Sequence, residues 1–247
     1  MGIGFLSTKA LLELCSYHYN DTKMKEKLEK VLRDKEVVVT WSGGLDTTVL
    51  LALLLEEFNL HVFPIFVNRS QSNYVGEKKS VDYFSETFYA RYPQKFHMYF
   101  MVTVAIPPLE IKKSYPSEPI PKTHALRNSD IVNQAVRYAL VKNIKLIAVG
   151  SLKSDIGYGD DSREYWKAKN NEVKEGTGAD ITILAPFQEL KWAKDDLVRW
   201  ASKKGIEMHR TWSCYHLYEK HCGKCGACER RKDAFKTAGV SDLTEYQ

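Results

Sequence analysis

Four cysteines close together near the end of the chain give the clearest chemical signal. Cys214, Cys222, Cys225 and Cys228 are separated by seven, two and two residues. Thiolates two residues apart on glycine-rich turns can converge on one ion, and four of them leave no position for water or substrate. The set therefore favours a structural Zn²⁺. An iron–sulfur cluster is the alternative, but the Cys-Pro that ends a ferredoxin run is missing.

A second signal is the sequence Trp-Ser-Gly-Gly-Leu-Asp-Thr-Thr at residues 41–48. Two glycines let the backbone turn tightly, and the helix expected to follow adds unpaired N–H donors that attract an anion. The Asp46 carboxylate can hold Mg²⁺ against phosphate oxygens. The residues expected to bind phosphate are Ser42, Gly43, Gly44, Leu45, Asp46, Thr47 and Thr48. The segment at 41–48 is not a Walker A loop, because the Gly-Lys-Ser/Thr element is missing. Composition alone leaves open a simple turn with a helix cap.

Short β-branched runs alternate with helical patterns along most of the chain. We expect strands at residues 36–41, 61–67, 96–104, 144–150 and 181–184, and helices at 46–58, 78–92, 128–142 and 192–203. Such alternation predicts an α/β fold with an open, mainly parallel sheet and helices on both faces. Apolar residues at helical spacing predict a helical extension before residue 36.

Two long stretches interrupt this rhythm, and we interpret both as functional loops. Residues 107–123 contain five prolines, which excludes regular structure, and residues 151–180 are polar and rich in Gly and Asp. Both follow predicted strands, at the end where open parallel sheets bind ligands.

Composition limits the remaining classes of function. The 247 residues carry a net charge of +5, and Lys and Glu are interspersed, so nucleic-acid binding is not favoured. The longest apolar run, residues 49–55, is far short of the ~20 residues that a membrane span needs. The first 20 residues lack the pattern of a signal peptide, so we expect a cytoplasmic protein, in which clustered cysteines bind metal and do not form disulfides. Cys15, outside the cluster, is expected to be a core thiol.

Ser-Gly-Gly-Leu-Asp-Thr-Thr after a strand resembles the SGGxDS motif of PP-loop ATP pyrophosphatases, with Thr47 in place of the usual Ser. The segment Thr-Trp-Ser-Cys-Tyr at residues 211–215 and the Cys-Gly-x-Cys-x-x-Cys run that follows it resemble the QueC family, the 7-cyano-7-deazaguanine synthases. Arg127-Asn128, the Gly-Tyr-Gly-Asp at 157–160 and Ala185-Pro186 agree in order, so the likeness covers about residues 37–246.

This resemblance implies a two-stage reaction on 7-carboxy-7-deazaguanine. ATP adenylates the carboxylate, and ammonia displaces AMP to give an amide. A second ATP then activates the amide oxygen, and elimination leaves a nitrile. The implied cofactors are ATP, Mg²⁺ and Zn²⁺, the implied partners are the deazapurine acid and ammonia, and the family leads us to expect a homodimer.

The resemblance also implies residues for the acid site. Asp46 and Arg127 would stabilise phosphate charge, and Asp160, Arg163 and Lys194 would line the acid site, with Asp161 and Lys191 as competitors for two of these roles. The sequence departs from the family at 159–163, which has Gly in place of Pro and is one residue longer. The family's Tyr-Gly-Gln-Arg element after the second strand is replaced here by Val-Asn-Arg-Ser-Gln at residues 67–71.

We therefore expect an N-terminal helical extension at 1–35, a PP-loop ATP-binding domain at 36–205 and a small four-cysteine zinc subdomain at 206–247. The departures leave three alternatives: a relative that acts on another carboxylate, one that stops at the amide or a conjugate, and a tRNA-modifying PP-loop enzyme.

Overall fold

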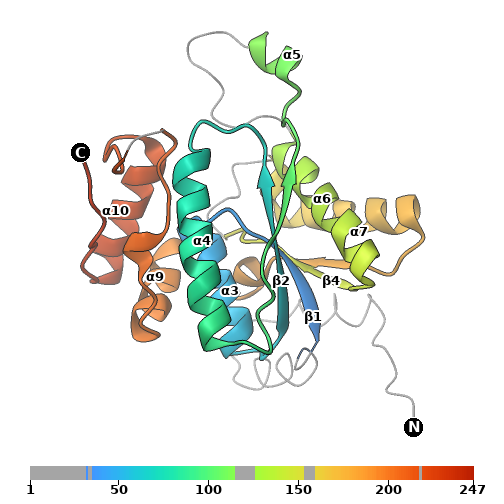
Figure 1. Cartoon of the computed structure of the whole chain (residues 1–247), viewed down its shortest axis with the longest axis horizontal. Helices are drawn as coiled ribbons and strands as arrows, with labels where there is room; N and C mark the ends of the chain where they lie inside the picture. Colours follow the sequence, from blue (N-terminus) through green and yellow to red (C-terminus); the bar gives the residue numbers. More distant parts are fainter. Residues whose placement is uncertain (1–31, 33–34, 115–125, 153–158, 217–218) are drawn as a thin grey trace.

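The computed structural model describes residues 32, 35–114, 126–152, 159–216 and 219–247. Its centre is a five-stranded parallel sheet in the order β3-β2-β1-β4-β5 (Figure 1). The strands are β1 (Glu36–Thr40), β2 (His61–Asn68), β3 (Phe100–Thr103), β4 (Leu146–Ala148) and β5 (Thr182–Leu184). The order reverses between β1 and β4, and at such a switch point open α/β sheets bind ligands beyond the carboxyl ends of the strands.

Helices cover both faces of this sheet, as the alternating pattern predicts (Figure 1). One layer contains α3 (Leu45–Glu56), α4 (Tyr74–Arg91), α9 (Lys194–Lys203) and α10 (Gly226–Ala238), whose apolar side chains share one core cluster. The opposite layer contains α6 (Arg127–Lys142) and α7 (Arg163–Thr177), which form the second cluster. The short helices α5 (Leu109–Lys113) and α8 (Pro186–Glu189) lie in connecting segments.

The central strand shows why the sheet is buried on both sides. In β1, Val37 and Val39 pack into the first cluster and Val38 packs into the second. Successive side chains of a strand point to opposite faces, so a run of valines suits a strand that helices cover on both faces. The apolar content of α3 has the same cause, since this helix lies inside the first layer and nine of its residues are buried.

The expectation that the two long interruptions lack regular structure is wrong in part. Residues 109–113 form α5 within the proline-rich stretch. Residues 163–177 form α7, a 15-residue helix inside the stretch that we interpreted as a loop. Its signals are a Ser162 side chain that caps the first turn, a left-handed Gly178 that ends the helix, and buried Trp166 and Val173. The density of charged residues conceals this spacing.

Several predictions fall on residues outside the described part of the chain. These are most of the helical extension at 1–35 with Cys15, most of the proline-rich stretch, and Gly157 and Tyr158. The division into three domains stays a prediction. Ala234 and Phe235 of the C-terminal segment lie in the same core cluster as α3. Among the described helices, none combines the length and the apolar character that a membrane crossing requires.

Candidate active site and four-cysteine centre

The turn between β1 and α3 has the geometry of an anion site. Gly43 adopts a left-handed backbone with φ of 71°, and Gly44 precedes the first residue of α3. The first N–H groups of a helix have no intrahelical partner and carry the positive end of its dipole, so the turn and helix present donors together. The Leu45 and Thr48 side chains are buried, and Thr48 accepts a hydrogen bond from the Trp41 indole at 3.1 Å. Only the backbones of these two residues are available to a ligand.

The two hydroxyls of the turn bond to each other and to the loop backbone. The Ser42 and Thr47 hydroxyl oxygens are 3.2 Å apart, and the Gly44 N–H donates to Ser42 Oγ at 3.3 Å. These distances are at the long end of the normal range, so the bonds are weak. A phosphate oxygen can take the place of Ser42 Oγ as acceptor for the Gly44 N–H.

Asp46 and Lys194 meet beside this turn. Lys194 Nζ lies 2.8 Å from Asp46 Oδ2, which brings together two predicted site residues that are 148 positions apart. The other carboxylate oxygen, Oδ1, is buried and has no hydrogen-bond partner among the described residues. An ionised oxygen left without a donor is the group that a bound cation satisfies, so the site fits Mg²⁺. The contact also favours Lys194 over Lys191 as the residue that faces the site.

The carboxyl end of β4 closes the other side of the turn. A side chain at Gly150 would place its Cβ 2.9 Å from Thr47 Cγ2, so only glycine lets this strand approach so closely. The next residue, Ser151, donates a short hydrogen bond to Asp161 and accepts one from the Trp166 indole at 3.1 Å.

The predicted residues Arg127 and Asp160 belong to a second group on this edge of the sheet. Asp160 Oδ2 accepts the Asn128 backbone N–H at 2.7 Å, which ties the 159–161 turn to the start of α6. The Arg127 guanidinium donates to the Asn128 side-chain oxygen at 3.2 Å. Asp160 and Asp161 both hold the loop together in this arrangement. Arg163 pairs with Glu189 at 2.9 Å, and its role in binding the acid stays a prediction.

A buried carboxylate in the first turn of α4 was not found from the sequence. Glu77 accepts from Gln71 at 2.6 Å and Asn73 at 3.0 Å, and lies 3.4 Å from Arg69. Burial raises the pKa of Glu77, and the Arg69 charge is the largest influence that opposes this rise. Burial lowers the pKa of Arg69, Glu77 raises it, and the nearby Arg127 charge lowers it again. Two guanidiniums therefore lie near each other at this edge.

The four cysteines converge as their spacing predicts. The thiols are buried, and their sulfur atoms all lie within 4.8 Å of one another. Two of the separations are 3.5 Å between Cys225 and Cys228 and 3.9 Å between Cys222 and Cys228. Four sulfurs about 2.3 Å from one tetrahedral ion would be about 3.8 Å apart. In a [4Fe–4S] cluster each cysteine binds a different iron, which holds the cysteine sulfurs further apart. The arrangement fits one ion.

The backbone around the cysteines favours thiolates. The His216 and Cys222 N–H groups donate to Cys214 Sγ, each at 3.4 Å, and the Cys225 N–H donates to Cys222 Sγ at 3.3 Å. Burial raises the pKa of Cys214 and of Cys228. At Cys225 burial acts in the same direction, but the surrounding N–H and thiol donors outweigh it and lower the pKa to about 7. A metal ion supplies the positive charge that four buried thiolates require.

A family model described as "Queuosine biosynthesis protein QueC" matches residues 36–239, which is most of the chain. The chain belongs to the QueC family. A 7-cyano-7-deazaguanine synthase of Oceanobacillus iheyensis is 30% identical over 224 residues, covering 86% of this QueC-family chain and 98% of the relative. The enzyme of that name from Methanosphaera stadtmanae is 37% identical over 122 residues, an alignment that covers 49% of this chain and 53% of the relative.

Among solved structures, the U34-tRNA thiolase NcsA from Methanococcus maripaludis, with its [4Fe-4S] cluster, is similar to this QueC-family chain. The TM-score is 0.51 at 16% identity, with 90% of this chain and 79% of that chain covered. At this identity the likeness shows a shared fold.

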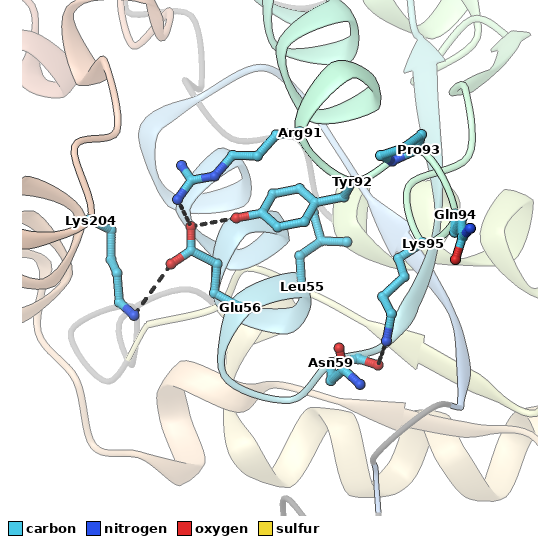
Figure 2. Close-up of a pocket in the computed structure, with 9 residues that line it drawn as sticks. All are labelled: Leu55, Glu56, Asn59, Arg91, Tyr92, Pro93, Gln94, Lys95 and Lys204. Carbon is cyan, nitrogen blue, oxygen red and sulfur yellow. Dashed lines mark hydrogen bonds and ion pairs between the residues drawn. The ribbon is translucent and has the colours of Figure 1, made fainter.

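A pocket of about 630 Å³ lies at the C-terminal end of α3, away from the turn at Ser42 (Figure 2). Its charged groups are paired. Glu56 accepts from the Tyr92 hydroxyl at 2.7 Å and pairs with Arg91 at 3.1 Å and Lys204 at 3.3 Å. The C-terminal ends of α3 and α4 lie here, and helix C-termini carry negative partial charge. The pocket lies at the opposite end of α3 from the turn at Ser42.

Proposed function

We propose that the chain is an ATP-dependent ligase that converts 7-carboxy-7-deazaguanine and ammonia, through the amide, into 7-cyano-7-deazaguanine. This proposal is supported by a turn with the geometry of an anion site in a member of the QueC family, next to an Asp46 oxygen that has no hydrogen-bond partner among the described residues. The relative aligned over 98% of its length is named a 7-cyano-7-deazaguanine synthase, which supports the choice of substrate.

In the first stage a carboxylate oxygen of the substrate attacks the α-phosphorus of ATP, and the bond to pyrophosphate breaks. The N–H groups of the turn at Gly44 and of the α3 N-terminus stabilise the negative charge that passes to pyrophosphate. Asp46 would hold Mg²⁺ here, and the ion would supply positive charge next to the phosphate oxygens. Lys194 orients the Asp46 carboxylate through its 2.8 Å contact and adds positive charge beside the turn.

Ammonia then attacks the acyl carbon, and AMP leaves with one oxygen of the former carboxylate. In the second stage the amide oxygen attacks the α-phosphorus of a second ATP, and the bond to pyrophosphate breaks again. Loss of AMP and of the amide protons leaves the nitrile, so each AMP carries one oxygen from the substrate. These steps need positioned charge and no covalent nucleophile. We assign Arg127, which lies near Arg69, to the stabilisation of the negative charge that develops on phosphate. We assign Asp160 to the placement of the turn at 159–161, which it ties to the start of α6, and the four cysteines to a structural Zn²⁺.

The test is mass spectrometry of the products after incubation of the metal-loaded protein with ATP, ammonium and 7-carboxy-7-deazaguanine. The proposal predicts the nitrile with two AMP for each nitrile. Accumulation of the amide would overturn the second stage. AMP formation that requires tRNA in place of the deazapurine acid would overturn the choice of substrate.

A further inference from the structure

The carbonyl oxygen of Gly43, in the middle of the phosphate-binding turn, is held from two directions. Ser80 Oγ of α4 donates to it at 2.7 Å, and the Trp212 backbone N–H donates to it at 2.9 Å. Ser80 is buried, with 2% of its surface exposed, so water does not compete for this bond. Trp212 lies two residues before the metal-ligand candidate Cys214.

Fixing this carbonyl also fixes the neighbouring N–H. In a trans peptide the C=O of one residue and the N–H of the next point in opposite directions. With the Gly43 oxygen held toward Ser80 and Trp212, the Gly44 N–H is turned toward Ser42 Oγ, 3.3 Å away, and the start of α3. A reversed peptide would point a carbonyl oxygen at the bound phosphate and repel it. The two donors therefore determine which end of the peptide dipole the ligand meets.

Trp212 is itself held by both the sheet domain and the cysteine segment. A Cβ at Gly76 of α4 would lie 2.3 Å from the indole ring, so the ring sits directly on this glycine. The indole N–H donates to the Cys214 carbonyl at 2.9 Å, and the Asn73 side chain donates to the same oxygen at 3.0 Å. Ser72 Oγ donates to the next carbonyl, Tyr215, at 3.0 Å.

We propose that the four-cysteine centre positions the phosphate-binding turn, with Ser80 and Trp212 as the positioning residues. The main-chain path from Cys214 through Trp212 to the Gly43 carbonyl couples the occupancy of the metal site to the orientation of the Gly44 N–H. This inference rests on the proposed function, since it takes the turn to bind the phosphates of ATP.

The test compares Ser80→Ala with Ser85→Ala in the metal-loaded protein. Ser85 lies on the same helix and is equally buried, but its hydroxyl faces the Met98 sulfur at 3.6 Å. The affinity for α,β-methylene-ATP, which keeps the triphosphate but cannot release pyrophosphate, is measured by calorimetry. Loss of one hydrogen bond that orients the turn is expected to raise Kd roughly three- to tenfold in Ser80→Ala. Ser85→Ala should bind as the wild type does.

The KM values separate positioning from general stability. We expect the KM for ATP to rise in Ser80→Ala while the KM for the deazapurine acid stays unchanged. If wild type binds the analogue and the two variants bind it equally well, the positioning proposal is wrong and the proposed function stands. If the wild type does not bind the analogue, the proposed function fails first.

Hydrogen exchange gives a readout that needs no catalysis. After chelation of the metal, we expect amide exchange in residues 41–46 to rise before exchange in β2 does. Unchanged exchange in residues 41–46, or a uniform rise over the whole chain, would overturn the specific coupling between the metal centre and the turn.

Discussion

At the scale of single residues, the proposed chemistry depends most on the Asp46 carboxylate. We predict that Asp46→Asn lowers pyrophosphate release by about 100-fold or more, because the amide cannot hold Mg²⁺ and no longer pairs with Lys194. Thermal unfolding should change little. Asp82→Asn is the matched control, since Asp82 pairs with Lys78 on α4. A variant at Asp46 with normal turnover would show that the carboxylate has no role in phosphate transfer.

Lys194 and Lys191 can be separated by the same assay. We predict that Lys194→Gln reduces kcat by about tenfold or more, because Asp46 loses its cationic partner and the turn loses a nearby positive charge. Lys191→Gln should retain wild-type kcat. Equal losses from both substitutions would contradict the assignment.

The chemistry of single residues was easier to predict than their contacts. Motif spacing indicated Asp46 and the four cysteines, because phosphate and metal sites demand particular residue types at fixed intervals. Ser80, Glu77 and the Trp212 contact to Gly43 gave no such signal. Ser80 and Trp212 reach Gly43 from segments far apart in the sequence, and no local spacing reveals such contacts. Glu77 bonds to residues only four to eight positions away, but no recognised motif marks them.

At the scale of elements, α10 is fastened by one buried guanidinium. Arg231 is fully buried and donates to Thr211 at 2.8 Å, Ser213 at 3.0 Å, Thr244 at 2.9 Å and the Met208 carbonyl at 2.6 Å. It thereby ties α10 to the segment before Cys214 and to the end of the chain.

We predict that Arg231→Leu lowers the free energy of unfolding by about 3 kcal/mol or more, because several buried polar groups lose their donor. Urea denaturation measures this loss. Its neighbour Arg230 bonds to the Tyr215 hydroxyl at an exposed position, so Arg230→Leu should cost less than about 1 kcal/mol. Similar losses in the two variants would contradict this account of α10.

The elements themselves were predictable where apolar periodicity was strong. All five expected strands and the four expected helices are present, with boundaries shifted by a few residues. The helix α7 escaped prediction because only one narrow stripe of it is buried, at Trp166, Lys169, Asn170 and Val173, and two of those residues are polar. The burial of Asn170 has a clear cause. Its side chain accepts a hydrogen bond from the Ile183 N–H and donates one to the Ile183 carbonyl, in the edge strand β5.

At the scale of the whole molecule, the sheet order places the turn between β1 and α3, Gly150 and the cysteine segment around the carboxyl ends of the strands. The alternation of strands and helices predicted a parallel sheet. The order β3-β2-β1-β4-β5 and the contact of the C-terminal segment with the turn required the structure. The homodimer stays a prediction.

We predict that the purified protein holds one zinc ion per chain by elemental analysis, and that Cys225→Ser loses it. The melting temperature of that variant should fall by roughly 10 °C, because an ion that binds only the folded state contributes its binding energy to stability. Cys15→Ser should keep the ion, because Cys15 is not one of the four clustered cysteines. Iron and sulfide in the protein would contradict the choice of metal.

If the substrate carboxylate takes AMP from ATP at the turn beginning at Ser42, an oxygen atom passes from the substrate to AMP. Labelling both carboxylate oxygens of 7-carboxy-7-deazaguanine with ¹⁸O, followed by mass spectrometry of the nucleotide product, measures this transfer. We predict AMP that carries one ¹⁸O, with two labelled AMP for each nitrile. Unlabelled AMP, or ADP and phosphate in place of AMP and pyrophosphate, would contradict it.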